Sequence, residues 1–235
     1  MGDKSAMNEK KFYIAFDIDG TIFSSEDILL EAYKRGIEEF NILKGYKLSP
    51  PTNEMLFSLV GRPYREIFKT LYPQLKEEDL EDFGFYIRKY LNSLVREGKG
   101  LWYDGICETI KELKNRGNLI LVASNGNETY IKSVLETKDI LDFFEPIITL
   151  DFNRINTKGD ILLEYINKYD IDPKRLIMVG DRKSDIDAAK TAGCWFVGTL
   201  YGHGEIEEIS QADFLINSPR ELLDIIDDIL HYEKI

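Results

Sequence analysis

The sequence predicts an α/β protein in which a doubly wound parallel sheet carries an all-helical segment after its first strand. From Leu101 onward, short and almost continuously apolar runs alternate with helical stretches. Such runs are typical of parallel strands that helices cover on both faces. A further run of this kind, residues 12–15, lies near the start of the chain, and a long helical segment separates it from the others. The simplest arrangement is one α/β core with a helical domain inserted into it.

The sheet is expected to form from apolar runs of three to five residues. The candidates are residues 12–15, 119–123, 146–150, 176–179, 195–197 and 214–216. Helical stretches between successive runs imply right-handed crossovers. Such crossovers wind the helices onto both faces of the sheet.

The inserted segment has the periodicity of amphipathic helices. Apolar residues recur at intervals near 3.6 from Asp27 to Leu43 and again from Glu77 to Val95. Pro50-Pro51 interrupts the chain between them, and Pro63 can begin another helix. We therefore predict an all-helical domain.

Two short linkers are expected to join this domain to the core. They lie near residues 23–25 and 98–100. The core then consists of residues 1–23 and 101–235, and the helical domain of residues 24–100. A chain of 235 residues is long enough for a substantial core with a smaller insert.

The composition excludes several classes of function. The formal net charge is −12, which disfavours a nucleic-acid-binding surface because such a surface needs a basic patch. Only His203 and His231 are present, too few for a His-rich zinc site. Cys107 and Cys194 form no CxxC pair, so we expect reduced thiols. His203 stands between two glycines, so we expect it in a loop. A role for it at the edge of a site stays open.

The chain is expected to be cytoplasmic. Met1 to Lys11 is polar and charged and lacks the apolar stretch of a secretory signal. No apolar run approaches the ~18 residues that a membrane span needs. We therefore expect neither a membrane nor a nucleic acid as partner.

Polar residues follow the predicted strands at the edge where ligands bind in an open parallel sheet, beyond the carboxyl ends of the strands. The residues that reach this edge are Asp17, Asp19, Ser124, Asn125, Lys158, Asp181 and Asp185. Each alone could be a turn former, a helix cap or a surface charge. Their coincidence at one edge favours a functional site.

The residue types at this edge indicate phosphoryl transfer. Asp17 and Asp19 are two apart, so on a strand both would point to the same face. Paired carboxylates can hold a hard cation such as Mg²⁺, and one can attack while the other moves protons. Ser124 supplies a hydroxyl group, and Lys158 supplies a positive charge for an anion.

Four motifs stand in a fixed order along the chain: Asp17-Ile18-Asp19-Gly20-Thr21, Ser124-Asn125, Lys158 and Gly180-Asp181-Arg182-Lys183-Ser184-Asp185. They resemble the four motifs of the haloacid dehalogenase superfamily of phosphohydrolases. The helical insert resembles the cap of the subgroup that contains phosphoglycolate phosphatase and β-phosphoglucomutase. The segments 185–193 and 201–204 are similar to the phosphoglycolate phosphatase branch. The resemblance implies a Rossmann-like core with a helical cap.

The resemblance also implies a role for each carboxylate. Asp17 would be the nucleophile that forms an aspartyl-phosphate and would bind Mg²⁺. Asp19 would be the general acid and then the general base, with its backbone carbonyl at the metal. Asp181 would ligate Mg²⁺ directly, and Asp185 would act from the second coordination shell.

The remaining motif residues would hold the phosphoryl group. The resemblance assigns this role to Thr21, Ser124, Asn125 and Lys158. The presence of Asp19 favours a phosphatase or a phosphomutase, because relatives with dehalogenase or phosphonatase chemistry lack this second acid.

The substrate is expected to be a small phosphorylated metabolite recognised by the cap. Arg62 and Arg65 lie in a loop between predicted helices and could bind a second anion, as in a phosphoglycolate-like substrate, or could be solvated surface charges. A Mg²⁺-dependent phosphatase is the leading interpretation. The alternatives are a β-phosphoglucomutase-like sugar phosphomutase, a nucleotide or pyrophosphate phosphatase, and a non-catalytic binding protein. The protein would be a monomer or a homodimer.

Overall fold

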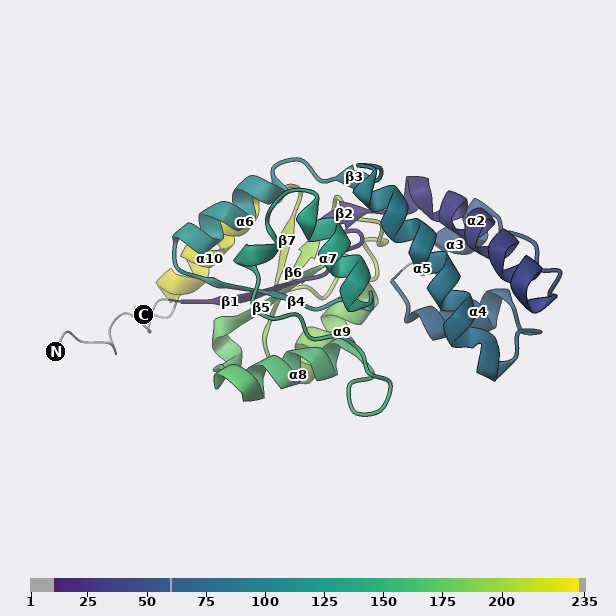
Figure 1. The fold of residues 1–235 in the computed structure, drawn as a ribbon. Coiled ribbons are helices and arrows are strands. Elements are labelled where there is room, and N and C mark those ends of the chain that lie inside the picture. The colour runs from purple at the N-terminus through teal and green to yellow at the C-terminus, as the bar shows by residue number, and fades with distance from the viewer. Residues whose placement is uncertain (1–10, 60, 233–235) are drawn as a thin grey trace.

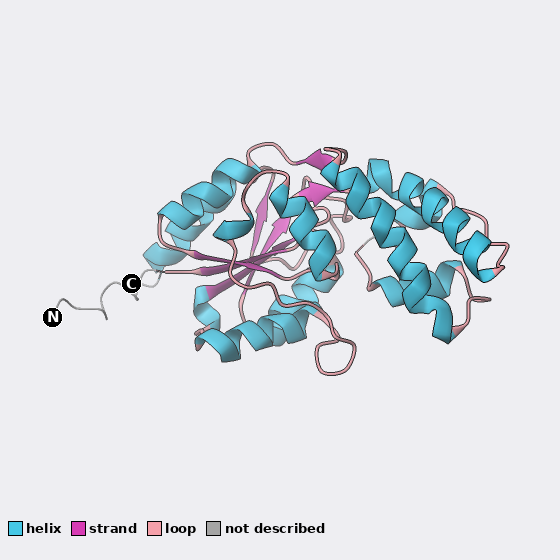
Figure 2. Ribbon diagram, viewed as in Figure 1, coloured by secondary structure: helices cyan, strands magenta, loops and turns pink. Residues whose placement is uncertain are grey.

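A parallel sheet with helices on both faces forms one end of the molecule, and a block of helices forms the other (Figures 1 and 2). The computed structural model describes residues 11–59 and 61–232. Residues 1–10, on which most of the argument about a secretory signal rests, lie outside the described residues.

The sheet contains five strands, all parallel, in the order β4-β1-β5-β6-β7. Their bounds are Tyr13–Phe16 (β1), Leu119–Val122 (β4), Leu176–Gly180 (β5), Trp195–Thr199 (β6) and Phe214–Ile216 (β7). The winding direction reverses at β1, because later strands are added first on one side of it and then on the other. Ligands bind at such a reversal, beyond the carboxyl ends of the strands.

Alternate residues of each strand belong to two different hydrophobic clusters. Ile14 and Phe16 of β1 pack with helices on one face, whereas Ala15 packs with helices on the other. The first face is covered by α6 (Ile106–Asn115), α7 (Glu128–Glu136) and α10 (Glu221–Tyr232). The second is covered by α8 (Lys158–Tyr169) and α9 (Lys183–Ala192). Burial on both faces explains why the strands are almost continuously apolar.

The predicted strand over residues 146–150 is wrong, since this segment is irregular. The chain before it forms a short 3₁₀ helix, η2 (Leu141–Phe143), and then a single parallel bridge between Phe144 and Ile120 of β4. The amide of Glu145 donates one more bond to Ile120, after which Pro146 has no N–H to donate. A second 3₁₀ helix, η3 (Pro173–Arg175), precedes β5.

The inserted block is helical throughout its regular elements. It contains α2 (Glu26–Lys44), α3 (Asn53–Phe57), α4 (Tyr64–Leu71), the 3₁₀ helix η1 (Glu77–Asp79) and α5 (Leu80–Arg96). The longest two, α2 and α5, pack along each other. Gly36 lies at their closest approach, where a Cβ atom would come within 2.9 Å of the backbone nitrogen of Ile87.

A short antiparallel ribbon lies where the chain passes between the sheet and the helical block. Its strands are β2 (Phe23–Ser24) and β3 (Leu101–Trp102). The ribbon therefore pairs the first predicted linker with the two residues that directly follow the second.

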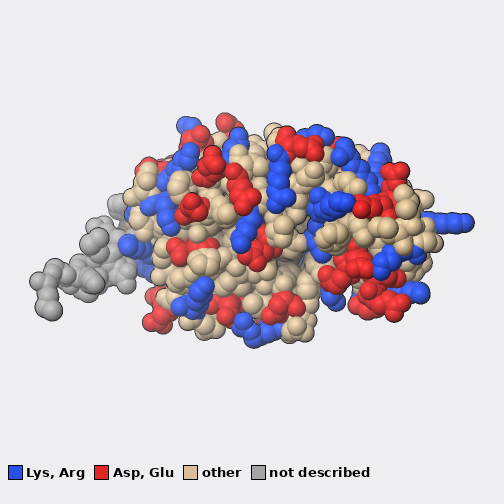
Figure 3. All heavy atoms as spheres, in the orientation of Figure 1, with Lys and Arg blue, Asp and Glu red and all other residues tan. Residues whose placement is uncertain are grey.

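Charged side chains of both signs are interspersed on the face of the molecule drawn in Figure 3.

None of the helices within residues 11–59 and 61–232 combines the length and the apolar character that crossing a bilayer requires.

Candidate active site

Asp17 is the first residue after β1, and it forms a buried ion pair with the first residue of α8. The Nζ atom of Lys158 lies 2.8 Å from Oδ2 of Asp17 and 2.7 Å from Oδ1 of Asp185. Burial opposes the charge of Lys158, but the two carboxylates outweigh it and raise the pKa of this amine. Lys158 is placed by the start of α8, where Thr157 and Asp160 form a capping box.

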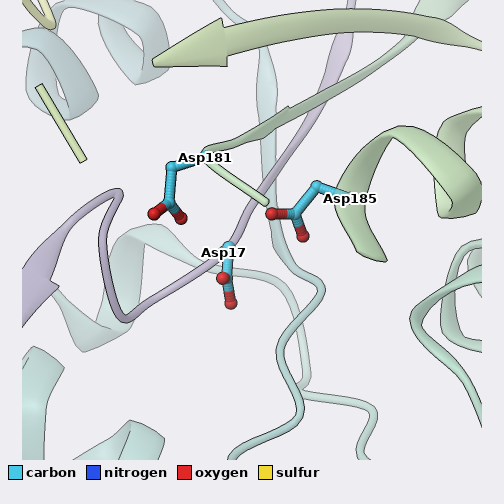
Figure 4. Close-up of side chains that lie close together, drawn as sticks. All are labelled: Asp17, Asp181 and Asp185. Carbon is cyan, nitrogen blue, oxygen red and sulfur yellow. The ribbon is translucent and has the colours of Figure 1, made fainter. Parts of the chain in front are cut away.

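Asp181 and Asp185 reach the same place from the end of β5 and the first turn of α9. One carboxylate oxygen from each of Asp17, Asp181 and Asp185 lies within 4.8 Å of the other two, and all three residues are buried (Figure 4). Burial, reinforced by Asp17, raises the pKa of Asp181 to about 6. Burial also raises the pKa of Asp185, against the opposing effect of Lys158. The positive charge of Lys158 alone therefore does not compensate the negative charge of the three buried carboxylates.

These carboxylates fit a hard divalent cation. Oδ2 of Asp181 accepts hydrogen bonds from the amides of His203 and Gly204, at 2.8 and 3.0 Å. Its other oxygen, Oδ1, is buried and has no hydrogen-bond partner among the described residues. A buried carboxylate oxygen without a partner, close to two other carboxylates, is a donor set that Mg²⁺ suits.

Asp19 lines the same cavity as Asp17 but has separate partners. Its Oδ1 atom accepts hydrogen bonds from Ser25 Oγ at 2.6 Å and from Tyr130 OH at 2.8 Å. Burial raises the pKa of Asp19, and these two hydrogen bonds partly offset the rise. Its side chain lies outside the cluster formed by Asp17, Asp181 and Asp185.

The different surroundings of the two aspartates follow from the end of β1. The strand stops at Phe16, and Ile18 lies in a bend. Alternation along a strand therefore does not set the directions of Asp17 and Asp19, although both line the same cavity. Gly20 continues the turn at φ 88°, and a Cβ atom there would overlap the carboxylate of Asp181.

The predicted phosphate-binding residues do not all reach the cavity. Ser124 and Asn125 line it together with Lys158. The amide of Gly126 donates to Ser124 Oγ at 3.2 Å, and the side chain of Asn125 donates to the carbonyl of Gly61 at 2.6 Å. Thr21 is fully buried, its hydroxyl has no partner among the described residues, and it does not line the cavity.

The two arginines expected in the cap occupy different environments. Arg62 is exposed and lines the cavity. Arg65 is paired with Glu81 at 2.7 Å and lies over the ring of Phe152 at 5.0 Å from its centre. Arg65 is therefore held by Glu81 of the helical block and by Phe152 of the segment before α8, and it does not line this cavity.

Two residues that line the cavity escaped the sequence analysis, and a third, Gly204, entered it only as part of segment 201–204. Tyr130 of α7 holds Asp19, and Arg88 of α5 lines the cavity. Gly204 approaches Asp181 so closely that a Cβ atom would overlap the carbonyl oxygen of Asp181. For Gly204, the only local signal in the sequence was the pair of glycines around His203. The backbone of this histidine binds Asp181, which places it beside the acidic cluster.

The cavity itself has a volume of about 130 Å³ and lies between the carboxyl edge of the sheet and the helical block. Asp17, Asp19, Ser124 and Lys158 line its end at the sheet. Side chains of α2, α4 and α5 line its other end. A ligand inside would therefore contact the acidic site and the helical block together.

A model of the haloacid dehalogenase-like hydrolases matches residues 14–199. The chain belongs to this family. The matched residues run from β1 to the end of β6 and include all four motifs.

Named haloacid dehalogenase relatives align with nearly the whole chain. Phosphoglycolate phosphatase from Vibrio vulnificus (strain CMCP6) is 30% identical over 218 residues, which cover 91% of this chain and 95% of that protein. Pyrophosphatase PpaX from Anoxybacillus flavithermus is 24% identical over 216 residues, with 91% and 95% covered.

A crystal structure of a predicted phosphatase from Clostridium acetobutylicum superposes with a TM-score of 0.75 at 25% identity, and covers 94% of this chain and 99% of that one. Together with the family match, these similarities confirm the predicted α/β fold class, the family and a hydrolase of phosphate esters.

Proposed function

We propose that this haloacid dehalogenase-family phosphatase hydrolyses a small phosphomonoester in two steps, through a phosphoryl group carried on Asp17. The observation that carries the proposal is the pairing of Asp17 with Lys158 at one end of the cavity, next to Asp181 and Asp185. Asp19 lines the same cavity but is free of that cluster, so it is available for proton transfer.

In the first step, a carboxylate oxygen of Asp17 attacks phosphorus, and the bond between phosphorus and the alcohol oxygen breaks. Asp19, protonated, donates its proton to the departing alcohol. Burial raises the pKa of Asp19, which favours the protonated acid that this step needs. The alcohol then leaves, and the phosphoryl group remains on Asp17.

In the second step, water attacks the phosphorus of the acyl phosphate. Asp19, now a carboxylate, takes a proton from that water. The bond between phosphorus and the oxygen of Asp17 breaks, which regenerates the Asp17 carboxylate and releases inorganic phosphate. One side chain thus serves as acid and then as base.

The surrounding residues stabilise the charge of the transferring group. Lys158 supplies a fixed positive charge, and the hydroxyl of Ser124 can donate a hydrogen bond to a phosphoryl oxygen. Asp17, Asp181 and the backbone carbonyl of Asp19 would hold Mg²⁺, and Asp185, whose two oxygens accept hydrogen bonds from Lys158 and the amide of Arg182, would act from the second coordination shell. When bound, this ion supplies positive charge that offsets the negative charge of the phosphoryl oxygens.

We further propose that residues 24–100 form a cap that encloses the substrate, and that residues 1–23 and 101–235 form the catalytic core. The β2–β3 ribbon supports this division, because both crossings of the chain meet there. Enclosure would exclude bulk water from the first step.

The relatives suggest two substrates for comparison, phosphoglycolate and pyrophosphate. The exposed guanidinium of Arg62 at the cavity could bind a second anion of either kind. A sugar phosphomutase with the same nucleophile is a further alternative. The cytoplasmic location, the absence of nucleic-acid and membrane partners, and a monomeric or homodimeric state stay predictions.

The test is release of inorganic phosphate from p-nitrophenyl phosphate, with and without Mg²⁺. Asp17→Asn and Asp19→Asn should each lower kcat by about a thousandfold or more. The acid-quenched wild-type protein should gain the mass of one phosphoryl group, and the Asp17→Asn protein should not. Asp187→Asn makes the same change in charge at an exposed position of α9 and serves as the control.

Full activity of Asp17→Asn would overturn this mechanism. A mutase would instead need a sugar bisphosphate to start turnover and would isomerise its substrate without net release of phosphate. Assays with each compound therefore separate the alternatives.

A further inference from the structure

The helical end of the cavity is almost entirely apolar. Six side chains from three helices form most of it: Leu29 and Tyr33 of α2, Ile67 and Phe68 of α4, and Ile87 and Leu91 of α5. Leu29 and Ile67 are half-buried, and the other four are buried. The surface that faces Asp17 and Asp19 across the cavity therefore offers few partners for hydroxyl groups.

Such a surface discriminates by the cost of desolvation. A sugar hydroxyl or a second phosphate placed against aliphatic and aromatic side chains loses its hydrogen bonds to water and gains none in return. A hydrocarbon body in the same place releases ordered water from both surfaces, which is favourable. The cap helices thus favour a leaving alcohol with an apolar body.

The volume limits the size of that body. The cavity measures about 130 Å³, close to the roughly 150 Å³ of an engineered apolar cavity that holds benzene. The cavity opens to solvent on one side, and the phosphoryl group at Asp17 and Ser124 fills part of it, so the part of the alcohol held against the apolar side chains is no larger than one small ring.

Two charged groups interrupt the apolar surface, the exposed Arg62 of the loop before α4 and the half-buried Arg88 of α5. The guanidinium of Arg88, from α5, lies over the ring of Tyr64 at 5.0 Å from its centre. Its Nη2 atom is 3.8 Å from Oε2 of Glu81, a long contact, and its Nη1 atom is buried without a hydrogen-bond partner among the described residues. Arg88 lines the cavity and one of its donors has no partner among the described residues, so its guanidinium is a candidate to bind an acceptor on the substrate.

We propose that the substrate is a phosphomonoester whose alcohol part has a ring-sized apolar body and, at its far end, a carboxylate or carbonyl oxygen that Arg88 binds. This inference rests on the proposed function, since it assumes that phosphoryl transfer occurs at Asp17. The apolar residues select the body of the alcohol, and Arg88 selects its terminal group.

The test compares phosphate esters of primary alcohols, so that the leaving groups differ little in acidity. The esters are benzyl phosphate, the phosphate ester of 4-(hydroxymethyl)benzoate, glycerol 3-phosphate and 2-phosphoglycolate, with pyrophosphate added. We expect kcat/KM for benzyl phosphate to exceed that for glycerol 3-phosphate at least about tenfold. The benzoate ester should be better still, by about a further tenfold.

Two variants locate the selection. In Leu29→Ser, the preference for benzyl phosphate over glycerol 3-phosphate should fall toward one. Leu30→Ser is the matched control, because Leu30 is the adjacent half-buried leucine of α2 and lines a different hollow of the surface. In Arg88→Met, the preference for the benzoate ester over benzyl phosphate should be lost.

The outcomes separate the inference from the proposed function. Equal or faster hydrolysis of glycerol 3-phosphate, phosphoglycolate or pyrophosphate by the wild-type enzyme would overturn the inference and leave the proposed function intact. A preference for benzyl phosphate that survives Leu29→Ser would show that the cap helices do not cause it, and would also overturn the inference. A folded enzyme with Mg²⁺ that releases phosphate neither from these compounds nor from p-nitrophenyl phosphate would overturn the proposed function itself.

Discussion

The side-chain amide of Asn125 donates a hydrogen bond of 2.6 Å to the backbone carbonyl of Gly61. This bond joins the loop after β4 to the loop between α3 and α4, and therefore joins the carboxyl edge of the sheet to the helical block. Ser124, the residue before Asn125, lines the cavity. The position of the helical block is thus tied directly to the loop proposed to bind the phosphoryl group.

Removal of this bond should loosen the enclosure of the cavity. In Asn125→Ala, we expect kcat/KM to fall by about tenfold, the equivalent of one good hydrogen bond. The backbone amides of Gly61, Arg62 and Tyr64 should exchange hydrogen faster with solvent. Asn217→Ala, at an exposed asparagine, is the control. Unchanged exchange rates in the Asn125 variant would show that the bond does not hold the loop.

Loss of the buried lysine should destabilise the fold. Lys158→Met removes the only cation paired with Asp17 and Asp185 among the described residues. We expect the free energy of unfolding without Mg²⁺ to fall by about 3–5 kcal/mol, because two carboxylates stay buried without compensation. Chemical denaturation measures this change. Added Mg²⁺ should recover part of the loss, and a variant as stable as the wild type would contradict the assignment.

Substitution of a metal ligand should have the opposite effect on stability. Burial raises the pKa of Asp181 to about 6, above its value in the unfolded chain. The stability linked to this group is therefore complete below about pH 4 and is lost as the pH rises through about 6. Asp181→Asn should stabilise the metal-free protein at pH 7 by roughly 1–3 kcal/mol.

The same variant should no longer respond to Mg²⁺. Wild-type protein should gain about 2.7 kcal/mol of stability when Mg²⁺ is at a hundred times its dissociation constant. Thermal unfolding at several Mg²⁺ concentrations measures the response. Asp187→Asn, on the exposed side of α9, should behave as the wild type. Equal stabilisation of the Asp181 variant by Mg²⁺ would place the ion elsewhere.

Tyr130 should set the pH dependence of the first chemical step. Its hydroxyl donates to Asp19, which stabilises the carboxylate and lowers the pKa of Asp19 against the larger effect of burial. In Tyr130→Phe the pKa of Asp19 should rise further. Because the first step needs protonated Asp19, the decline of kcat/KM at high pH should move to higher pH.

The control for this shift is Tyr165→Phe. Tyr165 is a buried tyrosine of α8 whose hydroxyl bonds to the backbone of Ile148 and Pro146, away from Asp19. Its removal should leave the pH profile in place. A profile for Tyr130→Phe that overlays the wild-type profile would mean that Tyr130 does not act through Asp19.

Much of the fold could be predicted because the signals are local. Residues 119–123 and 176–179 are apolar at every position, and a strand buried on both faces requires this. The rule that ligands bind beyond the carboxyl ends of parallel strands then placed Asp17, Lys158 and Asp181 together without knowledge of any contact. The helices of the insert followed from periodicity, although α5 begins at Leu80 because the three residues before it form a 3₁₀ turn.

The strand over residues 146–150 could not be excluded from the sequence. Its apolar residues suit a strand. The ladder of hydrogen bonds beside β4 ends there because Pro146 has no amide proton to continue it. A proline at the start of a strand is tolerated, so its effect depends on which neighbour the segment meets.

The sequence by itself determined the fold class, the family and the order of the four motifs, since each follows from short runs of residues and from the order of those runs along the chain. Only the tertiary structure decided that Asp185 joins Asp17 and Asp181 while Asp19 turns to Tyr130, and that Arg65 pairs with Glu81. It also decided that Arg88 and apolar helix faces enclose the cavity. These relationships join segments far apart in sequence, and the packing of helices against each other and the sheet sets their distances.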